Sequence, residues 1–227
     1  MASLNQSDRD ALCSHPHRSI TSITPVYHVG DLDSERSKPY YNYEGRGLSI
    51  STHSDAWQQI ARLSGDVYTL LNDQSEFYVV DPRSDTIQVE RDLCTDRGYI
   101  KSKTGYKVSY SDPEVGEERY LLYYDRESAE SEKDNRADLT DINLTQTAVY
   151  DLATNGEEYW REAFTKSASA ADPVEVASLI PIFVALELSV DGVWWDHPVQ
   201  PESYTAPRGT IFQPQLDNWH ISINDNR

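Results

Sequence analysis

The chain has 227 residues, of which 38 are Asp or Glu and 20 are Lys or Arg, so its formal net charge is −18. A field of this sign repels nucleic acid and anionic membranes, and direct binding to either is not expected. Hydrophobic residues make up 38% of the chain and aromatic residues 11%, too much for a disordered acidic polypeptide. A folded core is therefore expected.

Cysteine and membrane signals are both sparse. Cys13 and Cys94 are the only cysteines, so neither a disulfide framework nor a paired-cysteine metal site is predicted. No apolar stretch reaches the roughly 18 residues that cross a bilayer, and the first ten residues are polar. We expect a cytoplasmic protein without a metal.

The N-terminal residues 1–22 are rich in Ser, Asp, Arg and His and show no periodicity. We predict an irregular segment there, followed by a single α+β domain over 23–227. The β-branched and aromatic run 23–29 predicts a first strand, and the polar, Tyr-rich stretch 31–46 predicts an exposed loop.

Residues 47–51 alternate between apolar and small polar side chains, the period of a strand with one buried face. A helix is predicted over 54–64, because Ser54 suits its N-cap and an apolar stripe follows that stops at Gly65. Short strands are predicted at 67–71 and 77–80.

A second helix is predicted over 85–97, with Gly98 as its left-handed stop. Residues 99–110 and 119–124 flank a turn-rich linker and predict a hairpin. The stretch 125–141 is almost wholly polar, and its sequence is compatible with either an exposed helix or a mobile insertion.

The C-terminal half predicts a strand at 144–152 and a helix at 157–165. The most apolar run, 179–188, suits a central strand, and a buried helix over 174–185 is the alternative. Strands broken by prolines are predicted after residue 192. The whole pattern predicts an α+β fold: a twisted, mixed, largely antiparallel sheet with three or four flanking helices.

Most signatures of known chemistry are absent from the chain. It has no glycine-rich dinucleotide or phosphate loop, no HExxH zinc helix and no GxSxG nucleophile elbow. Its six histidines do not cluster with metal-ligand spacing, so we predict no metal cofactor.

One set of residues does cohere: Tyr27 and His28 at the end of the first strand, Ser49 and Ser51 on the second, and Asp196 after two tryptophans. This order resembles the N-terminal half of the ADP-ribosyltransferases with a His-Tyr-Glu type of site. The resemblance covers residues 23–65 and one acidic position.

The resemblance implies NAD as the cofactor. His28 would hydrogen-bond the adenosine ribose, and Ser49 or Ser51 would line the nicotinamide pocket. Asp196 would orient the nicotinamide ribose and assist attack at its anomeric carbon, and Tyr27 would be a further cofactor-binding residue. The acid is Asp where the family usually has Glu, and only Tyr68 and Tyr78 approach the family's tyrosine spacing. Arg208, between Pro207 and Gly209, is a candidate for an NAD phosphate.

A competing hypothesis needs no catalysis. An acidic surface on an ordered fold imitates the phosphate row of DNA and docks in the basic groove of a nucleic-acid-binding protein. The carboxylates of 112–118 and 127–141 are the best candidates. The sequence leaves open an NAD-dependent enzyme, such as an intracellular toxin or effector, and an acidic inhibitor.

Overall fold

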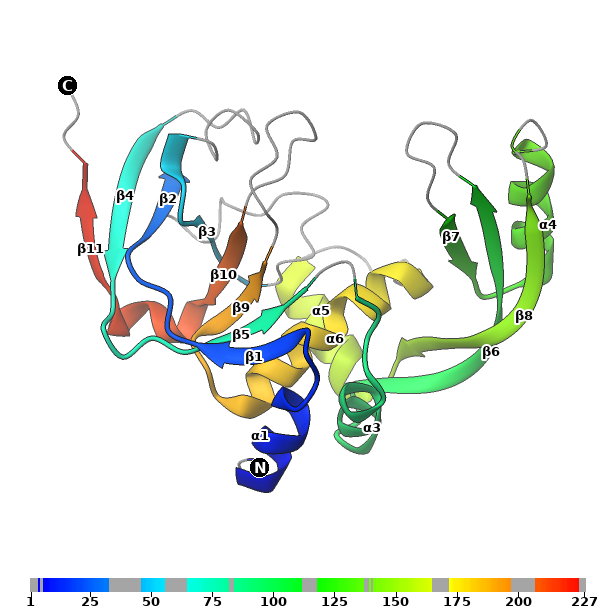
Figure 1. Cartoon of the computed structure of the whole chain (residues 1–227), viewed down its shortest axis with the longest axis horizontal. Helices are drawn as coiled ribbons and strands as arrows, with labels where there is room; N and C mark the ends of the chain where they lie inside the picture. Colours follow the sequence, from blue (N-terminus) through cyan, green and yellow to red (C-terminus); the bar gives the residue numbers. More distant parts are fainter. Residues whose placement is uncertain are drawn as a thin grey trace. The chain divides into compact units, whose positions relative to one another are not determined.

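The computed structural model describes residues 4, 6–32, 46–55, 65–81, 84–111, 118–136, 139, 141–164, 172–196 and 207–224. They form an α+β fold with two sheets (Figure 1). One has eight strands in the order β1-β5-β9-β10-β3-β2-β4-β11, and the other has three in the order β7-β6-β8. In the described residues β5 and β9 run parallel and the other pairs are antiparallel. The predicted class and sheet type are confirmed.

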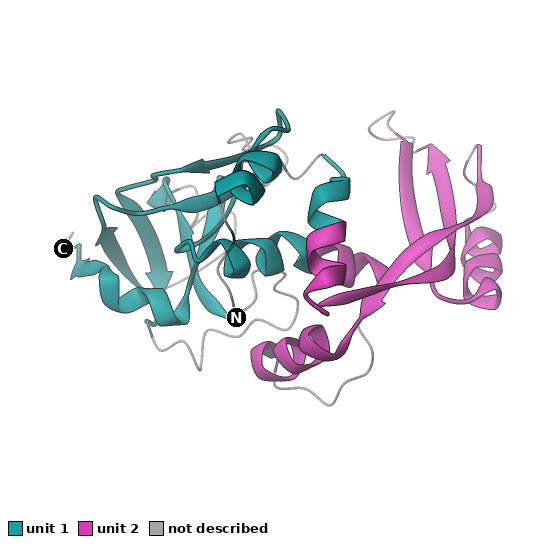
Figure 2. Cartoon of the chain, turned by 90° about the horizontal axis from the view of Figure 1, so that it is seen from below, with its two compact units in different colours: residues 1–91, 179–227 teal, residues 92–178 magenta. Residues whose placement is uncertain are grey.

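The chain divides into two compact units (Figure 2). Unit 1 comprises residues 1–91 and 179–227, and unit 2 comprises residues 92–178. The two divisions fall inside helices α3 (Gln88–Asp96) and α6 (Pro173–Leu188). The single α+β domain over residues 23–227 stays a prediction.

Unit 1 holds the eight-stranded sheet with α1 and a short 3-10 helix, η2. Their bounds are α1 Gln6–Cys13, β1 Arg18–Thr21, β2 Val26–Gly30, β3 Gly47–Ser51, β4 Asp66–Leu71, β5 Phe77–Val80, β9 Gly192–Trp195, β10 Arg208–Phe212, η2 Gln213–Asn218 and β11 His220–Ile223.

One face of this sheet carries the hydrophobic core of unit 1, and we call it the core face. It is built from alternate residues of the strands, as the period of two requires: Val26, Leu48, Ile50, Leu70, Phe77, Trp194 and Ile211, joined by Trp219 after η2. The ring of Phe77 packs against Trp194 at 6.1 Å and against Trp219 at 5.8 Å. The alternate residues between these lie on the opposite face, called the second face.

Unit 2 is built on the three-stranded sheet. Its elements are β6 Ile100–Ser111, β7 Glu118–Tyr123, α4 Arg126–Asn135, β8 Asn143–Leu152 and α5 Thr154–Phe164. The predicted hairpin is confirmed, since β6 and β7 pair antiparallel. Gly98 has φ +70, the left-handed conformation predicted at the end of α3.

The irregular segment predicted over residues 1–22 was wrong, because it contains α1 and β1. Leu12 of α1 is buried. The polar strand β1 pairs with β5 from Arg18 opposite Val80 to Thr21 opposite Phe77. A four-residue strand stabilised by a distant partner leaves no periodic signal in its own sequence.

The strand favoured over 179–188 was also wrong, and the alternative helix is present as α6. Seven consecutive residues, 179–185, are buried, so the helix is covered on all sides there. A helix that is apolar all round lacks the 3.6-residue pattern that separates helix from strand.

Other helix bounds differ from the predictions by a few residues. The helix predicted over 54–64 begins at Ser54 and Asp55, and its remainder lies outside the described residues. That predicted over 85–97 starts three residues later as α3, and that over 157–165 starts earlier as α5. The stretch 125–141 contains α4, capped by the Asp125 side chain on the Ser128 N–H.

With α1 and α6, the described residues hold five α-helices, the start of a sixth at Ser54 and Asp55, and one 3-10 helix, more than the three or four expected. None of the described helices is both long enough and apolar enough to cross a membrane.

Candidate functional site

The segments behind the transferase resemblance become neighbours in the sheet, in the order β9-β10-β3-β2. Ser51 lies opposite Tyr27 on one side and opposite Arg208 on the other. Arg208 in turn lies opposite Trp195. Directly paired residues of an antiparallel sheet share a face, so these four form one row across the second face. We call Tyr27, Ser51, Arg208 and Trp195 the cross-strand row.

The cross-strand row combines a cation, hydroxyls and aromatic rings. The Arg208 guanidinium lies 6.0 Å from the centre of the Trp195 ring. Ser51 is fully buried; its Oγ donates to Pro207 O at 2.6 Å and accepts from the His53 N–H at 3.1 Å. Trp195 is also buried, whereas Tyr27 and Arg208 are half-buried, so only these two members of the row have partial access to solvent.

Ser49 and Thr210 form a second pair beside the row, since they lie opposite each other on β3 and β10. Thr210 is fully buried, and its hydroxyl has no hydrogen-bond partner among the described residues. A Cβ on Gly47 would collide with this hydroxyl, which explains glycine there. Sequence reasoning missed Thr210, although its spacing of two from Arg208 placed both on one face.

His28 lies on the core face, apart from the cross-strand row. It is 5% exposed, and it pairs across β2 and β4 with Tyr68, the two rings being 6.2 Å apart. Its Nδ1 lies 2.8 Å from Ser49 O and its Nε2 lies 3.1 Å from Asp31 O. Both ring nitrogens thus face backbone carbonyls, which only accept hydrogen bonds. A ribose hydroxyl would have to displace one of these carbonyls.

Asp196 directly follows the cross-strand row at the end of β9. Its N–H donates to Val80 O at 3.1 Å, which prolongs the β5–β9 ladder, and the residue is exposed. Three strand spacings of about 4.8 Å separate β9 from β2, so the Cα atoms of Asp196 and His28 are at least about 14 Å apart. At this distance the two side chains cannot contact the same atom of a ligand. The resemblance does not require that, because it assigns His28 and Asp196 to different riboses.

Tyr68 and Tyr78 are not brought together. They lie on β4 and β5, which are separated in the sheet by β2, β3, β10 and β9. Tyr78 is fully buried, and its hydroxyl donates to Glu90 Oε1 at 2.8 Å. Burial, with the Glu90 carboxylate next in importance, raises the pKa of Tyr78 far above that of an ordinary tyrosine.

Glu90 is the centre of a buried polar cluster that the sequence did not reveal. Arg18 meets both of its oxygens, and the Ile87 N–H donates to Oε2 at 2.9 Å. Arg18 also donates to Ser84 Oγ at 2.6 Å. Every partner is supplied by the protein, so this cluster joins β1, β5 and α3 and has a structural role.

Two hollows lie elsewhere. In unit 1 a cavity of about 420 Å³ is lined by Asn72, Gln74, Glu76, Ser189, Val190, Asp191, Gln215 and Asn218. The Asp191 carboxylate is the best candidate in this cavity for binding a ligand. It already accepts hydrogen bonds from the Glu76 N–H at 2.8 Å and from Trp219 Nε1 at 3.2 Å. These bonds tie β9 to η2 and β5 and favour a structural role for Asp191.

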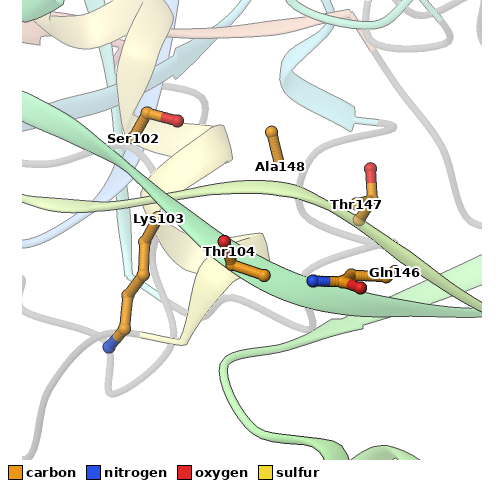
Figure 3. A pocket seen from close by; sticks show the side chains of 6 residues that line it. All are labelled: Ser102, Lys103, Thr104, Gln146, Thr147 and Ala148. Atoms are coloured by element: carbon orange, nitrogen blue, oxygen red, sulfur yellow. The ribbon is translucent and has the colours of Figure 1, made fainter.

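In unit 2 a shallow depression of about 410 Å³ lies over the middle of β6 and β8. Figure 3 shows its six side chains: Ser102, Lys103 and Thr104 from β6, and Gln146, Thr147 and Ala148 from β8. Only Lys103 is charged, and its ammonium group lies 4.5 Å from the centre of the Tyr124 ring.

Metal ligands do not gather in the described part of the chain, where no group of three or more His, Cys, Asp or Glu side chains is arranged to hold an ion. The rings of His15 and His17 lie 5.4 Å apart and are tilted by 49°, and His17 faces Asp81.

Comparison with models of protein families, with curated proteins and with solved structures finds no match to this chain. The residues of the site are therefore the basis for assigning a function.

Proposed function

We propose that unit 1 binds NAD and acts as an ADP-ribosyltransferase-like enzyme. The observation that carries this proposal is the cross-strand row, in which Tyr27, Ser51, Arg208 and Trp195 share one face of four adjacent strands. Two of these four, Tyr27 and Ser51, belong to the segment that resembles the family, and Arg208 was the candidate for an NAD phosphate.

The chemistry of the row suits the parts of a dinucleotide. A guanidinium presents a planar set of donors to phosphate oxygens. An indole such as Trp195 has the flat apolar surface that suits a nicotinamide ring, and because Trp195 is only 9% exposed, stacking requires its ring to become more exposed. The Thr210 hydroxyl lacks a hydrogen-bond partner among the described residues, but it is fully buried, so we assign it no ligand contact.

Asp196 takes the acidic role in this proposal. Breaking the bond between nicotinamide and ribose sends its electron pair to the nicotinamide and leaves an oxocarbenium-like carbon, which a nearby carboxylate stabilises. The acceptor's nucleophile then forms the new bond to that carbon and loses its proton. Asp196 is exposed and adjoins Trp195, so it is accessible to the ribose of a nicotinamide held at that ring.

In this proposal His28 must exchange a hydrogen-bond partner when NAD binds. In the resemblance it holds the adenosine ribose, and here its Nε2 faces Asp31 O. NAD binding through His28 requires the exchange of that contact for a ribose hydroxyl.

The acidic-inhibitor alternative receives less support from the described residues. On α4, Glu130 pairs with Arg126 and Glu132 pairs with Arg136, so both carboxylates are compensated locally. Residues 112–117 lie outside the described part. A cytoplasmic location for the transferase accords with Cys13 and Cys94, which form no disulfide in the described part of the chain. A toxin or effector role would follow from the identity of the acceptor.

The test is calorimetric titration of NAD together with release of free nicotinamide. Arg208→Gln should weaken NAD binding about tenfold or more, the loss of one charge-assisted contact of about 1.4 kcal/mol. Asp196→Asn should reduce nicotinamide release more than it weakens NAD binding. Arg126→Gln, at an exposed arginine of α4, is the matched control and should change neither.

Two results would overturn the proposal. One is the absence of NAD binding at millimolar concentrations. The other is binding and nicotinamide release by Arg208→Gln and Asp196→Asn at the level of the control.

A further inference from the structure

The outer edges of the two sheets differ in how they are protected against pairing with another chain. The edge strands of the large sheet, β1 and β11, have four residues each. The edge strand β7 begins with the charged pair Glu118 and Arg119. Short length and charge are two of the devices that keep sheet edges from pairing.

Over residues 143–150, the strand β8 has neither protection. It has ten residues and pairs with β6 over its whole length, and no strand of the described residues lies on its other side. Residues 143–150 carry no charge and no proline, in a chain of which 26% is charged. In contrast, where β6 extends beyond β7 it carries Lys101 and Lys103.

We propose that β8 is a self-association edge, which pairs antiparallel with β8 of a second copy about a two-fold axis at Thr147. The two three-stranded sheets then form one sheet of six strands. This inference concerns unit 2 and is independent of the proposed NAD site.

Complementarity of the strand with itself selects the second copy as the occupant. A two-fold axis perpendicular to the sheet keeps faces together, so each residue lies opposite one of the same parity. With the axis at Thr147, Thr145 lies opposite Val149, Leu144 opposite Tyr150 and Asn143 opposite Asp151. β-branched and aromatic cross-strand pairs stabilise a sheet, and no like charges are opposed.

Neighbouring registers are less favourable. An axis at Gln146 places Asp141 opposite Asp151, a like-charge pair. An axis at Ala148 places Leu152 in the new ladder opposite Leu144, but Leu152 is only 5% exposed within its own unit. The register centred on Thr147 avoids both problems.

The centre of the new ladder is accessible. Thr147 and its neighbours Gln146 and Ala148 line the open depression of Figure 3. Thr145, Gln146 and Ala148 are exposed, and Thr147 is half-buried. Since each copy carries a formal charge of −18, the two chains repel at low salt, and screening should strengthen the dimer.

The test combines sedimentation with site-specific cross-linking. The wild-type chain should sediment as a monomer–dimer equilibrium that shifts toward dimer as salt is raised. Thr147→Cys should oxidise to a disulfide-linked dimer, because the two copies of residue 147 oppose each other with Cβ atoms about 5 Å apart.

Thr145→Cys is the matched control, on the same strand and the same face. In the proposed register its two copies are four residues apart along the strand, about 14 Å, so it should not cross-link. Both variants are made with Cys13→Ser, which removes the more exposed of the two native cysteines.

A charge-reversal pair gives a second measurement that does not rely on oxidation. Thr147→Lys and Thr147→Glu should each be monomeric, because like charges meet at the axis, and a mixture of the two should recover the dimer. A wild-type monomer at every salt concentration, equal cross-linking of the two cysteine variants, or no recovery in the mixture would overturn the proposal.

Discussion

Arg18 and Glu90 form a fully buried two-point ion pair, with Arg18 Nε 2.7 Å from Glu90 Oε1 and Arg18 Nη2 3.1 Å from Glu90 Oε2. The residues are 72 positions apart in the chain, on β1 and α3. The pair therefore fixes the N-terminal strand against the rest of unit 1.

Removing one partner of this ion pair should be strongly destabilising. Arg18→Met or Glu90→Gln leaves the remaining partner buried without its counterpart, at a cost of about 3–5 kcal/mol. Urea unfolding of each variant measures this loss. The control Glu76→Gln, which removes an exposed carboxylate 3.6 Å from Arg9, should cost less than about 1 kcal/mol. Equal effects of all three variants would contradict a structural role for the pair.

The Tyr78 hydroxyl should make stability depend on alkaline pH. The pKa of Tyr78 is raised in the folded chain by burial and by Glu90, whereas the unfolded tyrosine ionises near pH 10. The stability from Tyr78 is therefore complete below pH 10 and falls by about 1.4 kcal/mol per pH unit above it.

Tyr78→Phe isolates this effect from the ionisation of the other tyrosines. The difference in unfolding free energy between wild type and Tyr78→Phe should be constant from pH 7 to about pH 9.5 and should shrink by pH 11. If this free-energy difference stays constant up to pH 11, the Tyr78 hydroxyl ionises alike in the folded and the unfolded chain, and the prediction is wrong.

Ser51 and Thr210 should respond oppositely to loss of their hydroxyls. Ser51→Ala removes bonds to Pro207 and His53 and should cost about 1–3 kcal/mol. Thr210→Val removes a buried hydroxyl without a hydrogen-bond partner among the described residues, so unfolding should show no loss or a small gain of stability.

Thr210→Val should also leave NAD binding unchanged, because the hydroxyl that it removes is fully buried. Its melting temperature should be kept as well. Destabilisation of Thr210→Val comparable to that of Ser51→Ala would mean that its hydroxyl has a structural partner.

The first turn of α4 should unfold in acid, because its N-cap depends on an ionised carboxylate. The Ser128 N–H and hydroxyl donate to the Asp125 carboxylate, which lowers the pKa of Asp125. The stabilisation is present above the ordinary pKa near 4 and is lost as pH falls through the lowered value. Amide hydrogen exchange of the first turn of α4 at pH 7 and pH 2.5 measures it.

Asp125→Asn is the matched variant for this measurement. Its amide oxygen still caps the helix and does not titrate, so first-turn protection should depend less on pH than in wild type. Asp125→Ala should lack protection at both pH values. Identical pH dependence of wild type and Asp125→Asn would exclude the cap as the titrating element.

Local sequence was sufficient where an element is defined by its own residues. The alternation Leu48-Ser-Ile50 predicted β3 with its bounds, and Gly98 predicted the end of α3, because both depend on side chains within a few positions. The α+β class followed from the same local patterns. Helix α6 was misassigned because burial on all sides erases the periodicity on which that reading depends.

Only the tertiary structure decided which residues meet. The pairing of Ser51 with Arg208 and the burial of Arg18 against Glu90 depend on strand order and on contacts far apart in the chain, which local propensity does not encode. The same strand order put His28 on the core face while Tyr27, its neighbour, joined the cross-strand row. A step of one residue changes the face of a strand, so the sequence proposed the members of the site and the sheet determined which of them lie together.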